Sequence, residues 1–144
     1  WVAADYLVDD GTVLPLHRKL YDYTATITPR CKSWALNDEQ FNRLHTLAQR
    51  CQSEGVRLIV VLPPMADNVR TEVCDVFGIT ETMQGTVLPT LAAWADECGF
   101  TLLDYEWGGS VITDDDKQFF DGFHLDERYG LPEWTQELFG DIAR

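Results

Sequence analysis

The residues best suited to chemistry are an aspartate and a histidine three positions apart, Asp121 and His124, in the segment FFDGFHLD at 119–126. A tight turn over residues 121 to 124 would bring both side chains to one edge of a sheet, where the carboxylate fixes the tautomer and orientation of the imidazole. An imidazole held in this way is a general base for a serine hydroxyl, which is too weakly acidic to attack unaided at neutral pH. In the structural alternative, Asp121 caps the final helix and His124 is only packed.

No serine in the chain has the surroundings expected of the nucleophile that such a base would serve. Ser33 is followed by Trp34, and Ser53 falls inside a predicted helix. Ser110 follows two glycines but lacks the trailing glycine of a nucleophile elbow, so an ordinary loop is the favoured interpretation there. The base and its carboxylate are therefore predicted without an identifiable nucleophile.

Five aspartates around the pair offer a different chemistry, the binding of a hard cation such as calcium. They lack the alternating ligands and the central glycine of an EF-hand, so we favour a solvated acidic loop over a metal site. These residues are Asp114, Asp115, Asp116, Asp121 and Asp126.

Aromatic side chains crowd the same region, and we expect them to form core and lid packing rather than a platform for a sugar ring. They are Trp107, Phe119, Phe120, Phe123, Tyr129 and Trp134.

A helix followed by a buried strand is the first unit that would position the pair. Asn37 and Gln40 have the spacing of a capping box, and apolar residues then recur at helical spacing until Gly55. Residues 56 to 62 form a nearly continuous run of β-branched residues and leucine, which is typical of a strand covered on both faces, and Pro63-Pro64 ends it.

A second helix and strand repeat this order. The helical pattern runs from Met83 to Cys98, with Pro89 starting or kinking it, and residues 101 to 105 form another short buried strand. A final helix is predicted from Glu133 to Ile142. This rhythm of βαβ units predicts an α/β fold, a three-layer sandwich with a mainly parallel sheet. Ligands of such sheets bind beyond the carboxyl ends of the strands, where the chain leads on towards the Asp-x-x-His segment.

Length and charge limit the possible classes of protein. The 144 residues suit a single domain, with a hairpin and connecting segment over 1–36 and a βαβ core over 37–144. The formal net charge of -13 would repel phosphate backbones and anionic lipid surfaces, so no nucleic-acid partner is expected. The longest apolar run is shorter than the roughly 20 residues of a membrane span. His17 and His45 have no charged partner at suggestive spacing and are expected to be structural or exposed.

The four cysteines lack the spacing of a metal site, and no cofactor is expected. Free thiols are slightly favoured over disulfides, although Cys51 and Cys98 end helices that lead into adjacent strands and are a conceivable pair in an exported protein. The other two are Cys31 and Cys74.

With these elements and motifs assembled, the chain resembles the SGNH hydrolase superfamily, in particular the membrane-anchored bacterial branch similar to the D-alanyl transfer protein of teichoic-acid modification. The resemblance covers roughly residues 38 to 142 and is carried by Leu62-Pro63-Pro64, by the strand ending at Asp104 and by the block at 119–125. It implies an SGNH or flavodoxin-like fold in which His124 is the base and Asp121 orients it. The implied reaction is acyl transfer or ester hydrolysis on a cell-envelope glycan or polymer.

The chain departs from this family where the nucleophile should lie, because it has neither the Gly-Asp-Ser-like turn nor the Gly-x-Asn block. The resemblance therefore implies a domain incomplete at its N-terminus, or a relative whose catalytic apparatus has decayed. In the first case the nucleophilic serine precedes Trp1. An N-terminal anchor, also missing from this sequence, would then hold the domain outside a bacterial cytoplasmic membrane.

The partner implied by the resemblance is a cell-envelope polysaccharide or an acyl donor. The alternative is a non-catalytic binding or assembly module of the same fold, because a fold does not guarantee an activity. A third hypothesis is metal-dependent hydrolysis through the acidic loop.

Overall fold

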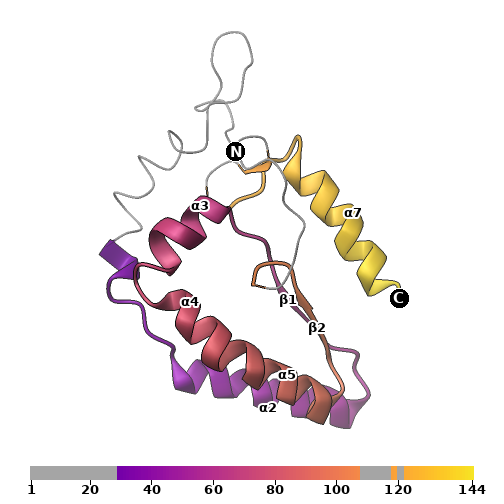
Figure 1. Ribbon diagram of the computed structural model, residues 1–144. Coiled ribbons are helices and arrows are strands. Elements are labelled where there is room, and N and C mark those ends of the chain that lie inside the picture. Colours follow the sequence, from indigo (N-terminus) through magenta and orange to yellow (C-terminus); the bar gives the residue numbers. More distant parts are fainter. Residues whose placement is uncertain (1–28, 108–117, 120–121) are drawn as a thin grey trace.

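The computed structural model describes residues 29–107, 118–119 and 122–144, and the predicted N-terminal hairpin lies outside these ranges (Figure 1). Two parallel strands and several helices make up the described residues, so the expected α/β character is confirmed. In chain order the elements are α2 (Asp38–Glu54), β1 (Ile59–Leu62), α3 (Asp67–Val69), the π-helical η2 (Arg70–Cys74), α4 (Ile79–Thr82), the π-helical η3 (Met83–Val87), α5 (Leu88–Cys98), β2 (Thr101–Asp104) and α7 (Gly130–Ile142).

Local signals define both ends of α2, as predicted. The side chain of Asn37 accepts a hydrogen bond from the backbone N–H of Gln40 at 3.0 Å, which satisfies one of the free donors of the first turn. At the other end Gly55 adopts a left-handed conformation with φ of 69°, and its N–H bonds the carbonyls of Cys51 and Gln52. A side chain at Gly55 would strain this turn.

The strands β1 and β2 pair in parallel, in a register that runs from Ile59 opposite Thr101 to Leu62 opposite Asp104. The sequence predicted a first strand covered on both faces from residue 56, but β1 starts at Ile59 and every residue of both strands is only half-buried. The reason is that β1 and β2 pair only with each other among the described residues, so the outer edges of the pair have no neighbouring strand.

The connection between the strands is helical over most of its length, whereas the sequence predicted a helix only from Met83 onwards. Helical turns begin at Asp67 and continue through η2, α4 and η3 into α5. Pro89 lies in the first turn of α5, directly after the wider turns of η3, and the backbone is helical on both sides of it. Pro89 therefore lies where the π-helical turns of η3 give way to the α-helical turns of α5.

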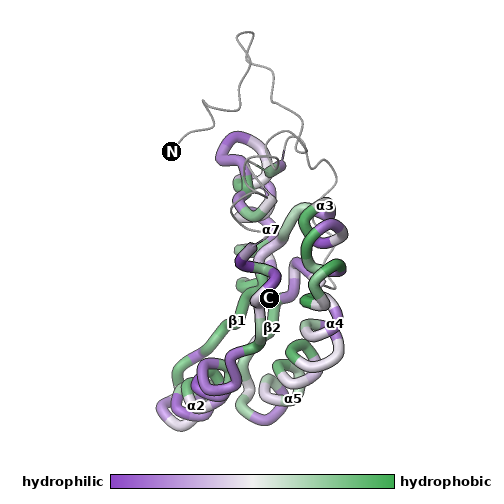
Figure 2. Tube along the Cα trace, turned by 90° about the vertical axis from the view of Figure 1, so that its left-hand side faces the viewer, coloured by the Kyte–Doolittle hydropathy of each residue, from purple (hydrophilic) through white to green (hydrophobic). Residues whose placement is uncertain are grey.

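Two hydrophobic clusters hold the elements together. The first joins Ala66, Val69 and Val73 of the crossover to Phe119. The second lies between α2, α5 and the strands and contains Ala48, Cys98 and Phe100, packed against Leu58, Val60, Trp94, Ala95 and Leu102. Figure 2 shows β1 and β2 side by side as a mainly apolar stretch.

The last helix, α7, runs along the side of the strands away from α2 and α5 (Figure 1). It begins at Gly130, three residues before the expected start at Glu133. Tyr105 fixes it to the end of β2 by donating a hydrogen bond to Asp141 at 2.6 Å and by an edge-on contact with Trp134 at 6.0 Å between centroids. Within the described ranges, no helix is both long and apolar enough to cross a membrane.

The four cysteines, all of which lie in the described part of the chain, are free thiols, as the sequence slightly favoured. The conceivable bond between Cys51 and Cys98 is not formed.

Candidate functional site

The loop that leaves β1 at its carboxyl end contacts the segment that carries His124. The N–H of Ala66 in this loop donates a hydrogen bond to the carbonyl of Gly122 at 3.0 Å. Phe119 and Leu125, which flank Gly122 in the sequence, pair with each other in an antiparallel bridge. Phe119 belongs to the first hydrophobic cluster, and Leu125 packs against it. The segment is therefore fixed at the edge of the parallel strands where α/β proteins bind ligands.

His124 lies in this fixed segment and is exposed to solvent. Asp121 lies outside the described residues, as do Asp114, Asp115 and Asp116. The orientation of His124 by Asp121 therefore stays a prediction.

Asp126 was predicted to belong to a solvated acidic loop, and the structure corrects this, because its residue is only 2% exposed. Its two carboxylate oxygens accept hydrogen bonds from the guanidinium of Arg128 at 3.0 and 2.8 Å, and these bonds raise the pKa of Arg128. Its backbone carbonyl accepts the N–H of Leu131 in the first turn of α7 at 3.0 Å. Asp126 thus shapes the start of α7 instead of offering a free oxygen to a cation.

The expected aromatic cluster divides between core and surface. Phe119 is fully buried, whereas Phe123 and Tyr129 are exposed. Trp134 of α7 packs edge-on against Tyr105. Phe120 lies outside the described residues.

A buried carboxyl group, Glu106, lies at the carboxyl end of β2 and was not identified from the sequence. Asp104 turns the chain there by accepting the backbone N–H groups of Glu106 and Trp107 at 3.0 and 2.8 Å. Glu106 is only 6% exposed, and its Oε2 has no hydrogen-bond partner among the described residues. Arg70 donates to its backbone carbonyl at 3.4 Å rather than to its carboxylate.

Burial raises the pKa of Glu106 to about 7 and outweighs the lowering effects of Arg70 and of a hydrogen bond from the backbone of Met65. The carboxylates of Asp104 and Asp67 raise the pKa further. A carboxyl group that titrates near neutral pH suits proton transfer, although a buried acid of this kind also occurs as a protonated core residue.

Glu106 and the His124 segment meet at the same loop. The backbone of Met65 bonds the carboxyl group of Glu106, and the N–H of the next residue, Ala66, bonds Gly122. One short stretch after β1 therefore brings together a buried acid and an exposed imidazole from distant parts of the sequence.

Cys74 lies near this loop but is no candidate for the missing nucleophile. Burial raises the pKa of its thiol to about 11, with a further contribution from Glu106. Its sulfur lies 3.7 Å from that of Met65. Because the thiolate is the nucleophilic form, Cys74 is unreactive at neutral pH.

Replacing Glu106 with glutamine is expected to remove a pH dependence of stability. The folded protein keeps the proton of Glu106 up to about pH 7, whereas the unfolded chain loses it near 4.5, so stability falls as the pH rises between these values. Glutamine has no proton to lose. Above about pH 7, Glu106→Gln should therefore be more stable than the parent by about 2 kcal/mol. This free-energy difference is smaller than the one that the full pKa shift would give, because water screens part of the effect.

Urea unfolding on both sides of this pH window measures the effect, with equal stabilities expected at the acidic end. The matched control is Glu81→Gln, an exposed glutamate of α4, which should keep the pH dependence of the parent. A Glu106→Gln protein with the same dependence as the parent would show that Glu106 does not titrate abnormally.

Comparison of the chain with protein-family models, with curated proteins and with solved structures found no match.

Proposed function

We propose that this chain is part of an SGNH-like domain that performs acyl transfer or ester hydrolysis on a cell-envelope glycan or polymer. His124 is the general base, and Asp121 orients its imidazole. The observation that carries the proposal is the hydrogen bond from Ala66 to Gly122, which holds the His124 segment at the carboxyl end of the parallel strands. His124 is also exposed to solvent.

We further propose that the fold is a three-layer sandwich whose sheet is completed by additional strands. Both strands are rich in apolar residues and yet only half-buried. Parallel sheets are normally covered on both faces and extend over more than two strands. Helices α2 and α5 on one side of the strands and α7 on the other supply the two outer layers of this arrangement (Figure 1).

In the proposed reaction, a serine hydroxyl from outside the described residues attacks the acyl carbonyl while the imidazole of His124 takes its proton. The charge of Asp121 stabilises the imidazolium that forms. Collapse of the tetrahedral intermediate breaks the bond to the leaving oxygen, which receives the proton from His124. Water or an acceptor hydroxyl then attacks the acyl-serine with the same help, which transfers the acyl group and restores the serine.

Labelling of the full-length protein with a fluorophosphonate tests the role of His124. Because the reagent reacts only with an activated serine, His124→Ala is expected to slow labelling by at least about 100-fold. The matched control is His45→Gln, which changes the histidine of α2 and should label at the parental rate. Equal labelling of the parent and His124→Ala would contradict the assigned base. A parent that does not label at all would support the non-catalytic binding or assembly module.

A further inference from the structure

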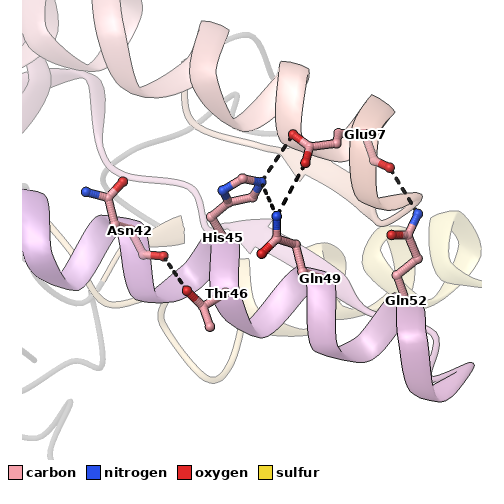
Figure 3. Close-up of polar contacts among 6 residues, drawn as sticks. All are labelled: Asn42, His45, Thr46, Gln49, Gln52 and Glu97. Atoms are coloured by element: carbon pink, nitrogen blue, oxygen red, sulfur yellow. Dashed lines mark hydrogen bonds and ion pairs between the residues drawn. The ribbon is translucent and has the colours of Figure 1, made fainter.

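A second cluster of reactive side chains lies between α2 and α5, away from the His124 segment. The sequence predicted no charged partner for His45, but its Nε2 lies 3.2 Å from Oε2 of Glu97, a residue of α5 that is 52 positions away (Figure 3). Cys98 follows Glu97 in the chain. The nitrogen, oxygen and sulfur atoms that these three side chains offer to a metal all lie within 4.8 Å of one another.

We propose that His45, Glu97 and Cys98 bind a zinc ion. Zinc accepts imidazole nitrogen, carboxylate oxygen and thiolate sulfur in one tetrahedral site, at bond lengths of about 2.0 to 2.3 Å. The ligand atoms of such a site are separated by roughly 3.3 to 3.7 Å, so small side-chain rotations are enough to close the cluster around an ion. Three protein ligands leave the fourth position for water.

The mixture of donor atoms selects the metal. Calcium and magnesium prefer a shell made of oxygen atoms, whereas this cluster offers one carboxylate beside an imidazole and a thiol. Zinc binding would replace the proton of the Cys98 thiol, which is released to solvent, by a zinc–sulfur bond.

The imidazole of His45 is held in position before any ion binds. Its ring stacks on the indole of Trp94, with the centroids 4.6 Å apart and the planes inclined by only 3°. The amide nitrogen of Gln49 lies 3.5 Å from Nε2 of His45 and 3.4 Å from Oε1 of Glu97. These neighbours orient two of the three ligands, which is the role that outer-shell residues play in metal sites.

The end of α5 attracts a cation. Glu97 and Cys98 are its last two residues, and the carbonyl end of a helix carries a partial negative charge. A basic residue in the last turn would offset this charge, but the last turns of α5 and α2 contain none. Asp96 adds an exposed acid to the same turn. The acidic side chains and the negative end of the helix dipole repel one another, and a bound metal ion would offset this repulsion.

The three ligands of the cluster differ in their exposure to solvent. Cys98 is only 4% exposed, whereas the side chains of His45 and Glu97 are 25% and 54% exposed. The side chain of Gln52 donates to the backbone carbonyl of Glu97 at 3.0 Å and ties the two helices together beside the cluster (Figure 3). An ion can therefore reach two of the three ligands directly from solvent.

Titration of the reduced protein with cobalt(II), followed by displacement with zinc, tests the site. Cobalt bound to a thiolate absorbs in the near ultraviolet, so the band reports the sulfur ligand directly. We expect one ion per chain, loss of the band in Cys98→Ser, and zinc affinity reduced at least about 10-fold in His45→Gln and in Glu97→Gln. Because Glu97 is exposed, its variant tests the site without endangering the fold.

Matched controls separate this cluster from other ligands of the chain. Cys51→Ser removes a neighbouring thiol of α2, and His124→Gln removes the proposed catalytic imidazole; both should bind zinc as the parent does. Unchanged affinity in the three cluster variants, or an equal loss in the two controls, would overturn the proposal. Because His124 is outside the cluster, this result is independent of the labelling experiment.

Discussion

Replacing Phe119 with alanine is expected to lower the free energy of unfolding by about 4 kcal/mol. Its side chain is 0% exposed and packs against Ala66, Val69 and Val73. Truncation would remove buried apolar area and leave a cavity that the surrounding helices fill only in part. The same side chain anchors the His124 segment, so the variant should also reduce fluorophosphonate labelling of the full-length protein.

Urea unfolding of the parent and of two phenylalanine variants measures the effect. Phe139 of α7 is 65% exposed, and Phe139→Ala should change stability by less than about 0.5 kcal/mol. Phe119→Leu keeps most of the buried volume and should fall between the parent and Phe119→Ala. If Phe119→Ala were as stable as Phe139→Ala, Phe119 could not be the anchor described above.

The second large effect is expected at Gly130, where α7 begins. A methyl group on this residue would lie 2.1 Å from the backbone carbonyl oxygen of Gln118 and 2.8 Å from its carbonyl carbon. Backbone atoms cannot rotate away as a side chain can, so the helix start or the 118–119 segment must move. Gly130→Ala should therefore destabilise the protein by about 3 kcal/mol.

Gly140 provides a control in the same helix. Nothing lies within 4 Å of a methyl group added there, so Gly140→Ala should stabilise the protein by up to about 1 kcal/mol through helix propensity. Thermal unfolding of the two variants should move the midpoint in opposite directions. A Gly130→Ala protein as stable as Gly140→Ala would mean that α7 does not approach Gln118 closely.

The sequence predicted those helices and strands that are marked by residues close together in the chain. Asn37, Gln40 and Gly55 define α2, and the two apolar runs define a pair of strands that proved to be parallel. Helix α3 was missed because it follows two prolines and starts without a side-chain cap at Ala66. The start of α7 was placed too late because it depends on contact with Gln118, which residue types near Gly130 do not reveal.

The candidate sites likewise divide into those visible in nearby residues of the sequence and those that depend on the fold. Asp121 and His124 could be selected from residue type and spacing alone, whereas Glu106 became a candidate only when the fold buried its carboxyl group. The one signal in the sequence was an acidic residue just past the end of a strand. The pairing of His45 with Glu97 joins two helices and therefore has no local pattern.

The parallel pairing of Ile59 with Thr101 also bears on the order of folding. These partners are 42 positions apart (101 − 59), so their alignment requires closure of a long loop, which costs entropy before any contact is gained. Helix α2, whose contacts are local, can form first, and the strands associate only after the crossover has condensed. We therefore expect the edge that presents His124 to form late in folding.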